Sequence, residues 1–92
     1  MTKIIFNVTD KSVYVDCLKH ADNHDVCTII STLMNVLVAE CMRQGKSPTA
    51  YEPGHVLIDA TFDDISAIEV FNAVYQVLSV VADEHPEHVR LY

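Results

Sequence analysis

The chain has little of what marks an irregular or flexible protein. Its 92 residues include only two glycines, three prolines and no tryptophan, and no repeat or low-complexity segment interrupts it. Half of the residues are apolar, which is too many for a chain that stays disordered. This length predicts one domain, residues 1–92, with a modest core. Dimerisation would cover any apolar surface left over.

Positive charge is also scarce. Six lysines and arginines stand against 13 aspartates and glutamates, which gives a net charge of −7. An acidic surface repels phosphate backbones, so we expect no direct binding of nucleic acid. The charge either suits a basic peptide or protein partner or serves only to keep the protein in solution.

Cysteines are few and show no paired spacing. The three residues Cys17, Cys27 and Cys41 form an odd set, which argues against a disulfide scaffold and favours a reducing cytoplasm. The N-terminal M-T-K-I-I-F-N lacks the apolar core of a signal peptide. No uninterrupted apolar run approaches the roughly 20 residues of a membrane span. The sequence therefore predicts a cytoplasmic protein without a membrane partner.

Alternating apolar and polar residues predict the strands. Pro53 and Gly54 fit the two central positions of a type II turn, so the segments on either side of them form a hairpin. A turn cluster, T-D-K-S, joins the first two segments into another hairpin. The predicted strands cover residues 3–8, 13–18, 48–52, 55–62 and 89–92.

Two segments have helical periodicity instead. The first helix is expected from residue 26 to about residue 44, with Asp25 as its cap. The second follows Asp63 or Asp64 and runs to about residue 84. The resulting order, ββαββαβ, predicts an α/β fold of the α+β two-layer sandwich type, with two helices over one face of a mostly antiparallel sheet.

The segment K-H-A-D-N-H-D-V-C-T-I-I-S, residues 19–31, gathers the reactive side chains. Six residues separate His20 from Cys27, so the two can face each other across a strand-to-helix loop. Cys27 would lie in the first helical turn, where amide groups and the helix dipole favour a thiolate. Such a sulfur beside an imidazole can perform nucleophilic acyl transfer, and the amides could bind the oxyanion. Ser31 lies one helical turn after Cys27 and can approach the same site.

The residues alone leave three interpretations of Cys27 open. It is a nucleophile, or a small buried apolar side chain, or a metal ligand together with His20 and His24, with Asp22 or Asp25 as a fourth ligand. A single dense loop seldom supplies a whole tetrahedral site, so we expect neither a metal nor a cofactor.

The other cysteines and histidines have simpler explanations. Cys17 falls on a strand face and Cys41 on a helical apolar stripe, which predicts that both are core residues. His55 follows a turn and is expected to be exposed. His85 and His88 flank a proline near the chain end, where we expect solvated side chains.

The 19–31 segment resembles the Prp (YsxB-like) family of small bacterial cysteine proteases. That family is marked by Gly-His-Ala, a glycine-bearing loop and then Asp-Ile-Val-Cys-Ala-x-x-Ser at the start of a helix. The pair His20-Ala21 matches the first element, and Val26-Cys27 with Ser31 matches the second. Lys19 replaces the usual glycine, and the loop between histidine and cysteine is shorter than in the family.

The resemblance implies a usually dimeric two-layer domain that cleaves a peptide bond. Cys27 would be the nucleophile and His20 its base, with Ser31 beside them; His24 is an alternative base and Asp25 a further supporting residue. The implied substrate is the N-terminal extension of a large-subunit ribosomal protein or, in a phage or prophage member, a capsid or scaffold protein. The alternatives are a catalytically inactive Prp-like dimer that only binds a protein, and a small metal-binding protein.

Overall fold

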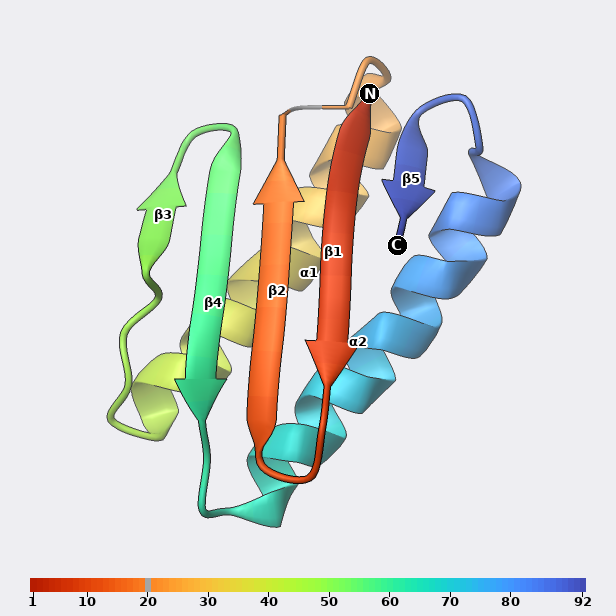
Figure 1. The fold of residues 1–92 in the computed structure, drawn as a ribbon. Coiled ribbons are helices and arrows are strands. Elements are labelled where there is room, and N and C mark those ends of the chain that lie inside the picture. Colours follow the sequence, from red (N-terminus) through yellow and green to blue (C-terminus); the bar gives the residue numbers. More distant parts are fainter. Residues whose placement is uncertain (20) are drawn as a thin grey trace.

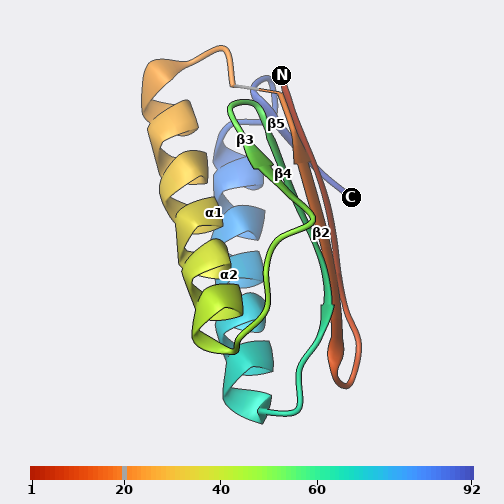
Figure 2. The same ribbon diagram turned by 90° about the vertical axis from the view of Figure 1, so that its left-hand side faces the viewer.

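The computed structural model describes residues 1–19 and 21–92. Within them the elements follow the predicted order, and they form two layers, a sheet and a pair of helices that covers one of its faces (Figures 1 and 2). The predicted α+β two-layer sandwich is therefore confirmed. The strands are β1 (Thr2–Val8), β2 (Ser12–Leu18), β3 (Ala50–Glu52), β4 (His55–Thr61) and β5 (Val89–Leu91), and the helices are α1 (His24–Arg43) and α2 (Ile65–Glu84).

The sheet has the strand order β3-β4-β2-β1-β5. The β1–β2, β2–β4 and β3–β4 pairs are antiparallel, whereas β5 pairs with β1 in parallel. The short strands β3 and β5 form the two edges. The long strands β1, β2 and β4 form its centre and carry the core.

Strict alternation along the central strands builds the core. In β1, Ile4 and Phe6 are buried while Lys3 and Ile5 are exposed, because successive side chains point to opposite faces of a sheet. The buried set faces the helices, where Phe6 packs against Phe71 with ring centroids 6.4 Å apart. Within the described residues, both helices lie on the same side of the sheet and leave its other face uncovered (Figure 2).

The cap of α1 differs from the prediction. Asn23, not Asp25, is the capping residue, and its Oδ1 accepts hydrogen bonds from the backbone N–H groups of Asp25 (2.9 Å) and Val26 (3.2 Å). Asn23 has the extended backbone that a cap requires (φ −105°, ψ 128°), whereas Asp25 already lies inside the helix. At α2 the prediction that included Asp64 is confirmed, because its Oδ1 accepts from Ser66 N–H over 2.9 Å.

Both helices would pass a membrane-span test by length and composition, with mean hydropathies of 1.5 for α1 and 1.6 for α2. The sequence-based expectation considered only uninterrupted apolar runs, so it did not anticipate the high mean hydropathy of these two helices. In the fold, one face of each helix supplies core residues that pack on the sheet, Leu37 and Cys41 from α1 and Phe71 and Leu78 from α2. A helix that packs one face into a protein core can therefore be as apolar as a membrane-spanning helix.

Candidate active site

The first turn of α1 holds Cys27. Its backbone N–H donates to the carbonyl oxygen of Asn23 over 2.9 Å, which is the first regular hydrogen bond of the helix. The side chain is half-buried and lies near the positive end of the helix dipole, as the sequence predicted. The neighbouring amides of Asp25 and Val26 already donate to the Asn23 side chain. The predicted oxyanion donors at this helix end are therefore engaged within the helix cap.

Cys27 lines a cavity between α1 and the β3–β4 hairpin. The cavity has a volume of about 330 Å³, and Figure 2 shows β3 closer to the helix layer than β2 is. Along α1 it is lined by Cys27, Ser31 and Asn35, which recur every four residues and so share one face of the helix. The structure thus brings Ser31 to the same cavity as Cys27, as the sequence predicted.

The base of the cavity is apolar. Ile30 and Met34 of α1 meet Cys17 of β2 and Val56 of β4 there. Cys17 is buried, and burial raises the pKa of its thiol to about 11, with smaller contributions from Asp16 and Cys27. Cys17 is therefore a neutral core thiol, and its predicted place in the core is confirmed. Cys41, also predicted as core, is fully buried.

A strained residue forms the next part of the wall. Lys19 has a positive φ of 71°, a left-handed conformation that costs a residue with a side chain about 1–2 kcal/mol. Its N–H donates to the Gly54 carbonyl over 2.8 Å, and its carbonyl accepts from Thr2 Oγ1 over 3.3 Å. The position at which the Prp motif carries glycine is thus one where this fold needs left-handed backbone, held from both sides.

The structure does not bring the other predicted site residues to the cavity beside Cys27 and Ser31 in the part of the chain that it describes. His20, the predicted base, lies outside the described residues, although Lys19 and Ala21 on either side of it both line the cavity. His24 and Asp25 are exposed at the start of α1, and neither is among the described residues that line the cavity.

A metal centre finds little support in the part of the chain that the structure describes. No group of three histidine, cysteine, aspartate or glutamate side chains there could hold an ion. The carboxylate of Asp22, one of the candidate ligands, pairs with the N-terminal ammonium over 3.2 Å.

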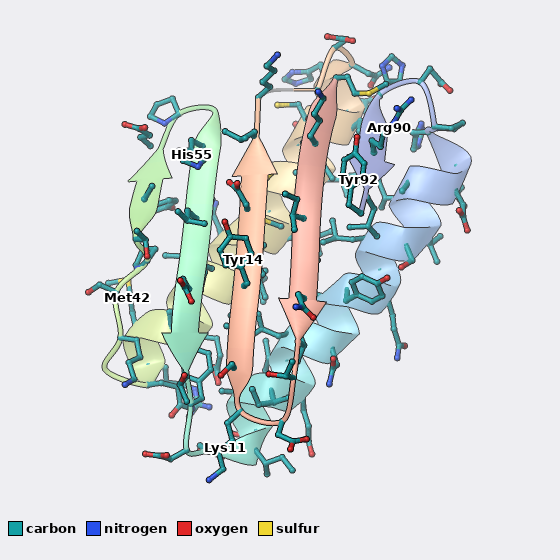
Figure 3. The ribbon with its side chains drawn as sticks, in the orientation of Figure 1. Lys11, Tyr14, Met42, His55, Arg90 and Tyr92 are labelled. Carbon is teal, nitrogen blue, oxygen red and sulfur yellow. The ribbon has the colours of Figure 1, made fainter. Side chains whose placement is uncertain are left out.

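The expectation that His55 is exposed is wrong. Its Nε2 lies 3.0 Å from Asp16 Oδ1, its Nδ1 lies 3.9 Å from Glu52 Oε1, and 28% of its side chain is exposed. His55 opens β4 next to the cavity (Figure 3). Strand alternation places its ring on the outer face with Asp16, because Val56 and Ile58 point toward the helices. This pairing across β2 and β4 was not visible in the sequence.

The expectation for the last two histidines is also wrong. His85 and His88 are half-buried, because the turn that carries them is tied to the first strand by a hydrogen bond from Thr2 N–H to the His88 carbonyl, 2.9 Å long. Neither lies among the described residues around the cavity.

Sequence reasoning also missed a contact between the two walls of the cavity. The hydroxyl of Tyr51 in β3 donates to Asn35 Oδ1 in α1 over 2.7 Å. No local pattern signals it, since it depends on how the hairpin packs beside the helix. An exposed tyrosine on an edge strand was the only available hint.

No protein-family model and no curated protein sequence matches the chain. Solved structures do match. The essential ribosomal processing protease Prp from S. aureus, in complex with a covalently linked product peptide, superposes with a TM-score of 0.79 at 22% identity, covering 99% of this chain and 97% of that one. The same protease with a substrate peptide gives 0.76 at 23% identity, covering 100% and 98%. The protein SMU.848 from Streptococcus mutans gives 0.77 at 21% identity, covering 99% and 91%. The chain therefore has the Prp-like fold over its whole length.

Proposed function

We propose that the protein is a Prp-like cysteine endopeptidase that cleaves a peptide bond in a protein substrate. One observation carries the proposal: Cys27 lies in the first turn of α1, in the wall of a 330 Å³ cavity that it shares with Ser31. The likeness of fold to a protease captured with substrate and product peptides supports it.

In the proposed reaction the sulfur of Cys27 attacks the scissile carbonyl carbon. His20 takes the thiol proton and returns it to the leaving amine as the carbon–nitrogen bond breaks. A water molecule, deprotonated by the same imidazole, then hydrolyses the thioester and frees Cys27. Ser31, one turn along α1, orients the reacting groups. His24 is the alternative general base, and the carboxylate of Asp25 adds negative charge beside it.

The substrate side of the proposal follows from charge. A chain of net charge −7 attracts a basic segment, and Glu52, whose side chain is exposed, is one of the residues that line the cavity. A basic extension of a ribosomal protein or a phage capsid or scaffold protein fits this requirement. We place the protein in the cytoplasm of a bacterial or phage-infected cell and expect it to act as a homodimer.

One observation favours the alternative of an inactive, protein-binding Prp-like module. The amides of Asp25 and Val26 are taken by the Asn23 cap, so an oxyanion would need other donors or a rearranged cap. A module that had lost turnover would keep the cavity and still grip a peptide.

Digestion of a degenerate peptide library, read by mass spectrometry, tests the proposal. The protein should produce new termini, Cys27→Ala should produce none, and Cys41→Ala should retain the activity because Cys41 is far along α1 in the core. Peptides that bind without being cut would establish the alternative. Equal cleavage by the Cys27→Ala protein would refute Cys27 as the nucleophile.

A further inference from the structure

The cavity beside Cys27 ends where two exposed side chains meet. Among the described residues that line it, Asn35 is the farthest along α1 and Tyr51 is the earliest in the hairpin. The hydrogen bond from the Tyr51 hydroxyl to Asn35 Oδ1, 2.7 Å long, joins the helical wall to the strand wall at that point. The part of the cavity that runs along α1 from Cys27 is thus a groove, and the Tyr51–Asn35 hydrogen bond crosses it at its far end.

The length of this groove follows from helix geometry. Asn35 is eight residues after Cys27, which corresponds to about 12 Å along the axis. An extended peptide advances about 3.3 Å per residue. The space between Cys27 and the closing pair therefore holds about three or four substrate residues.

The Tyr51–Asn35 hydrogen bond also connects β3 to α1. β3 is a three-residue edge strand that pairs with β4 on one side. On its other side the Tyr51 hydroxyl reaches Asn35. Both side chains are exposed, so replacing either one opens the end of the groove without removing a core residue.

We infer that the Tyr51–Asn35 pair sets the length of substrate that the groove holds on the amino-terminal side of the scissile bond. This inference rests on the proposed function, because in thiol catalysis the amino-terminal portion stays bonded to the sulfur while the other portion leaves. A closed groove next to Cys27 suits the portion that must be retained. Residues beyond the third or fourth bend away into solvent and add nothing to recognition.

Peptidyl chloromethyl ketones test this without requiring turnover. In acetyl-(Ala)n-Leu chloromethyl ketones the sulfur of Cys27 displaces chloride, so a sulfur–carbon bond forms as the carbon–chlorine bond breaks. We expect the second-order rate of Cys27 alkylation to rise by about fourfold for each alanine that adds one buried methyl group. The rise should stop once the peptide has about three or four residues in all, as the length of the groove requires.

Two variants and one control locate the limit. In Tyr51→Ala and in Asn35→Ala the rate should continue to rise through at least two further alanines. Tyr92→Ala serves as the matched control, since Tyr92 and Tyr51 are similarly exposed, 59% and 57%, and it should keep the original limit. Circular dichroism melting checks that each variant is folded, and Asn35→Ala remains informative if Tyr51→Ala is not.

The outcomes separate this inference from the proposed function. A rate that rises without limit in the original protein, or a limit unchanged in both variants, overturns the inference even if peptides are cleaved. A limit that shifts in the variants of a protein that cleaves no peptide would show that the pair sets the length of peptide held beside Cys27, and would refute the peptidase.

Discussion

The backbone N–H of Lys19 donates to the carbonyl oxygen of Gly54 across 2.8 Å. The bond joins the end of β2 to the turn between β3 and β4, and both residues line the cavity that contains Cys27. Both also have positive φ, 71° for Lys19 and 80° for Gly54. The turn suits glycine, whereas Lys19 holds its conformation at a cost that the fold must offset.

Lys19→Gly should therefore stabilise the protein. Removing the side chain relieves the strain of the left-handed conformation, which destabilises the folded state by about 1–2 kcal/mol. The greater conformational freedom of glycine in the unfolded chain offsets part of this stabilisation. We expect a net rise of about 0.5–1 kcal/mol in the free energy of unfolding, measured by urea denaturation. Lys46→Gly, at an exposed lysine without positive φ, is the control and should lower it. A loss of stability in Lys19→Gly would contradict the strain.

Asn23→Ala should destabilise the start of α1. Its side chain satisfies the amides of Asp25 and Val26, and loss of such a cap typically costs about 1 kcal/mol. Asn23→Ser, which can accept the same hydrogen bonds, should recover most of the loss. Hydrogen exchange at the two amides provides a local readout, and unchanged protection in Asn23→Ala would show that the cap is not what holds them.

The three thiols should react very differently with iodoacetamide. Burial raises the pKa of Cys17 and of Cys41 to about 11, so at pH 7.5 both are thiols enclosed in the core. Cys27 is half-buried at the cavity wall. Peptide mapping should find a single carbamidomethyl group, on Cys27, in the folded protein, and three groups after unfolding. Early labelling of Cys17 or Cys41 would contradict this burial.

Stability should fall in alkaline solution through the buried thiols. The folded pKa of Cys41, about 11, lies above its ordinary value of 9.0, so between these values the unfolded chain loses the proton first. The stabilisation is complete below pH 9 and is lost as pH rises toward 11, by roughly 2–3 kcal/mol for a shift of this size. Cys41→Ala should have a lower melting temperature at pH 8 but a smaller decrease from pH 9 to 11. An identical decrease would contradict the raised pKa.

The architecture could be predicted because each strand and helix has its own regular spacing of apolar residues. The alternation in β1 and β2 predicts that one face of each strand is buried, and the helical stripe through Leu37 and Cys41 predicts a buried face of α1. In the structure those faces are buried. The cap of α1 was harder, since Asn23 and Asp25 have similar side chains. Their backbone conformations decide which one caps, and these depend on where the helix begins.

The site was predictable only where one helix turn determines it. Ser31 shares the cavity with Cys27 because four residues make about one turn. The strained backbone of Lys19, the His55–Asp16 pair and the Tyr51–Asn35 hydrogen bond instead join segments distant in the chain. The Tyr51–Asn35 contact arises from the packing of the β3–β4 hairpin beside α1, and the other two arise from the pairing of the hairpin with β2. No local pattern encodes them.

The proposed function requires that the sulfur of Cys27 carry the acyl group during peptide cleavage. Rapid acid quenching of a digestion of the best-cleaved library peptide, followed by mass spectrometry, tests it most directly. A transient thioester is expected on the peptide that contains Cys27, with the mass of the amino-terminal product. Steady cleavage with no adduct on Cys27, and undiminished cleavage after that thiol is alkylated, would contradict it.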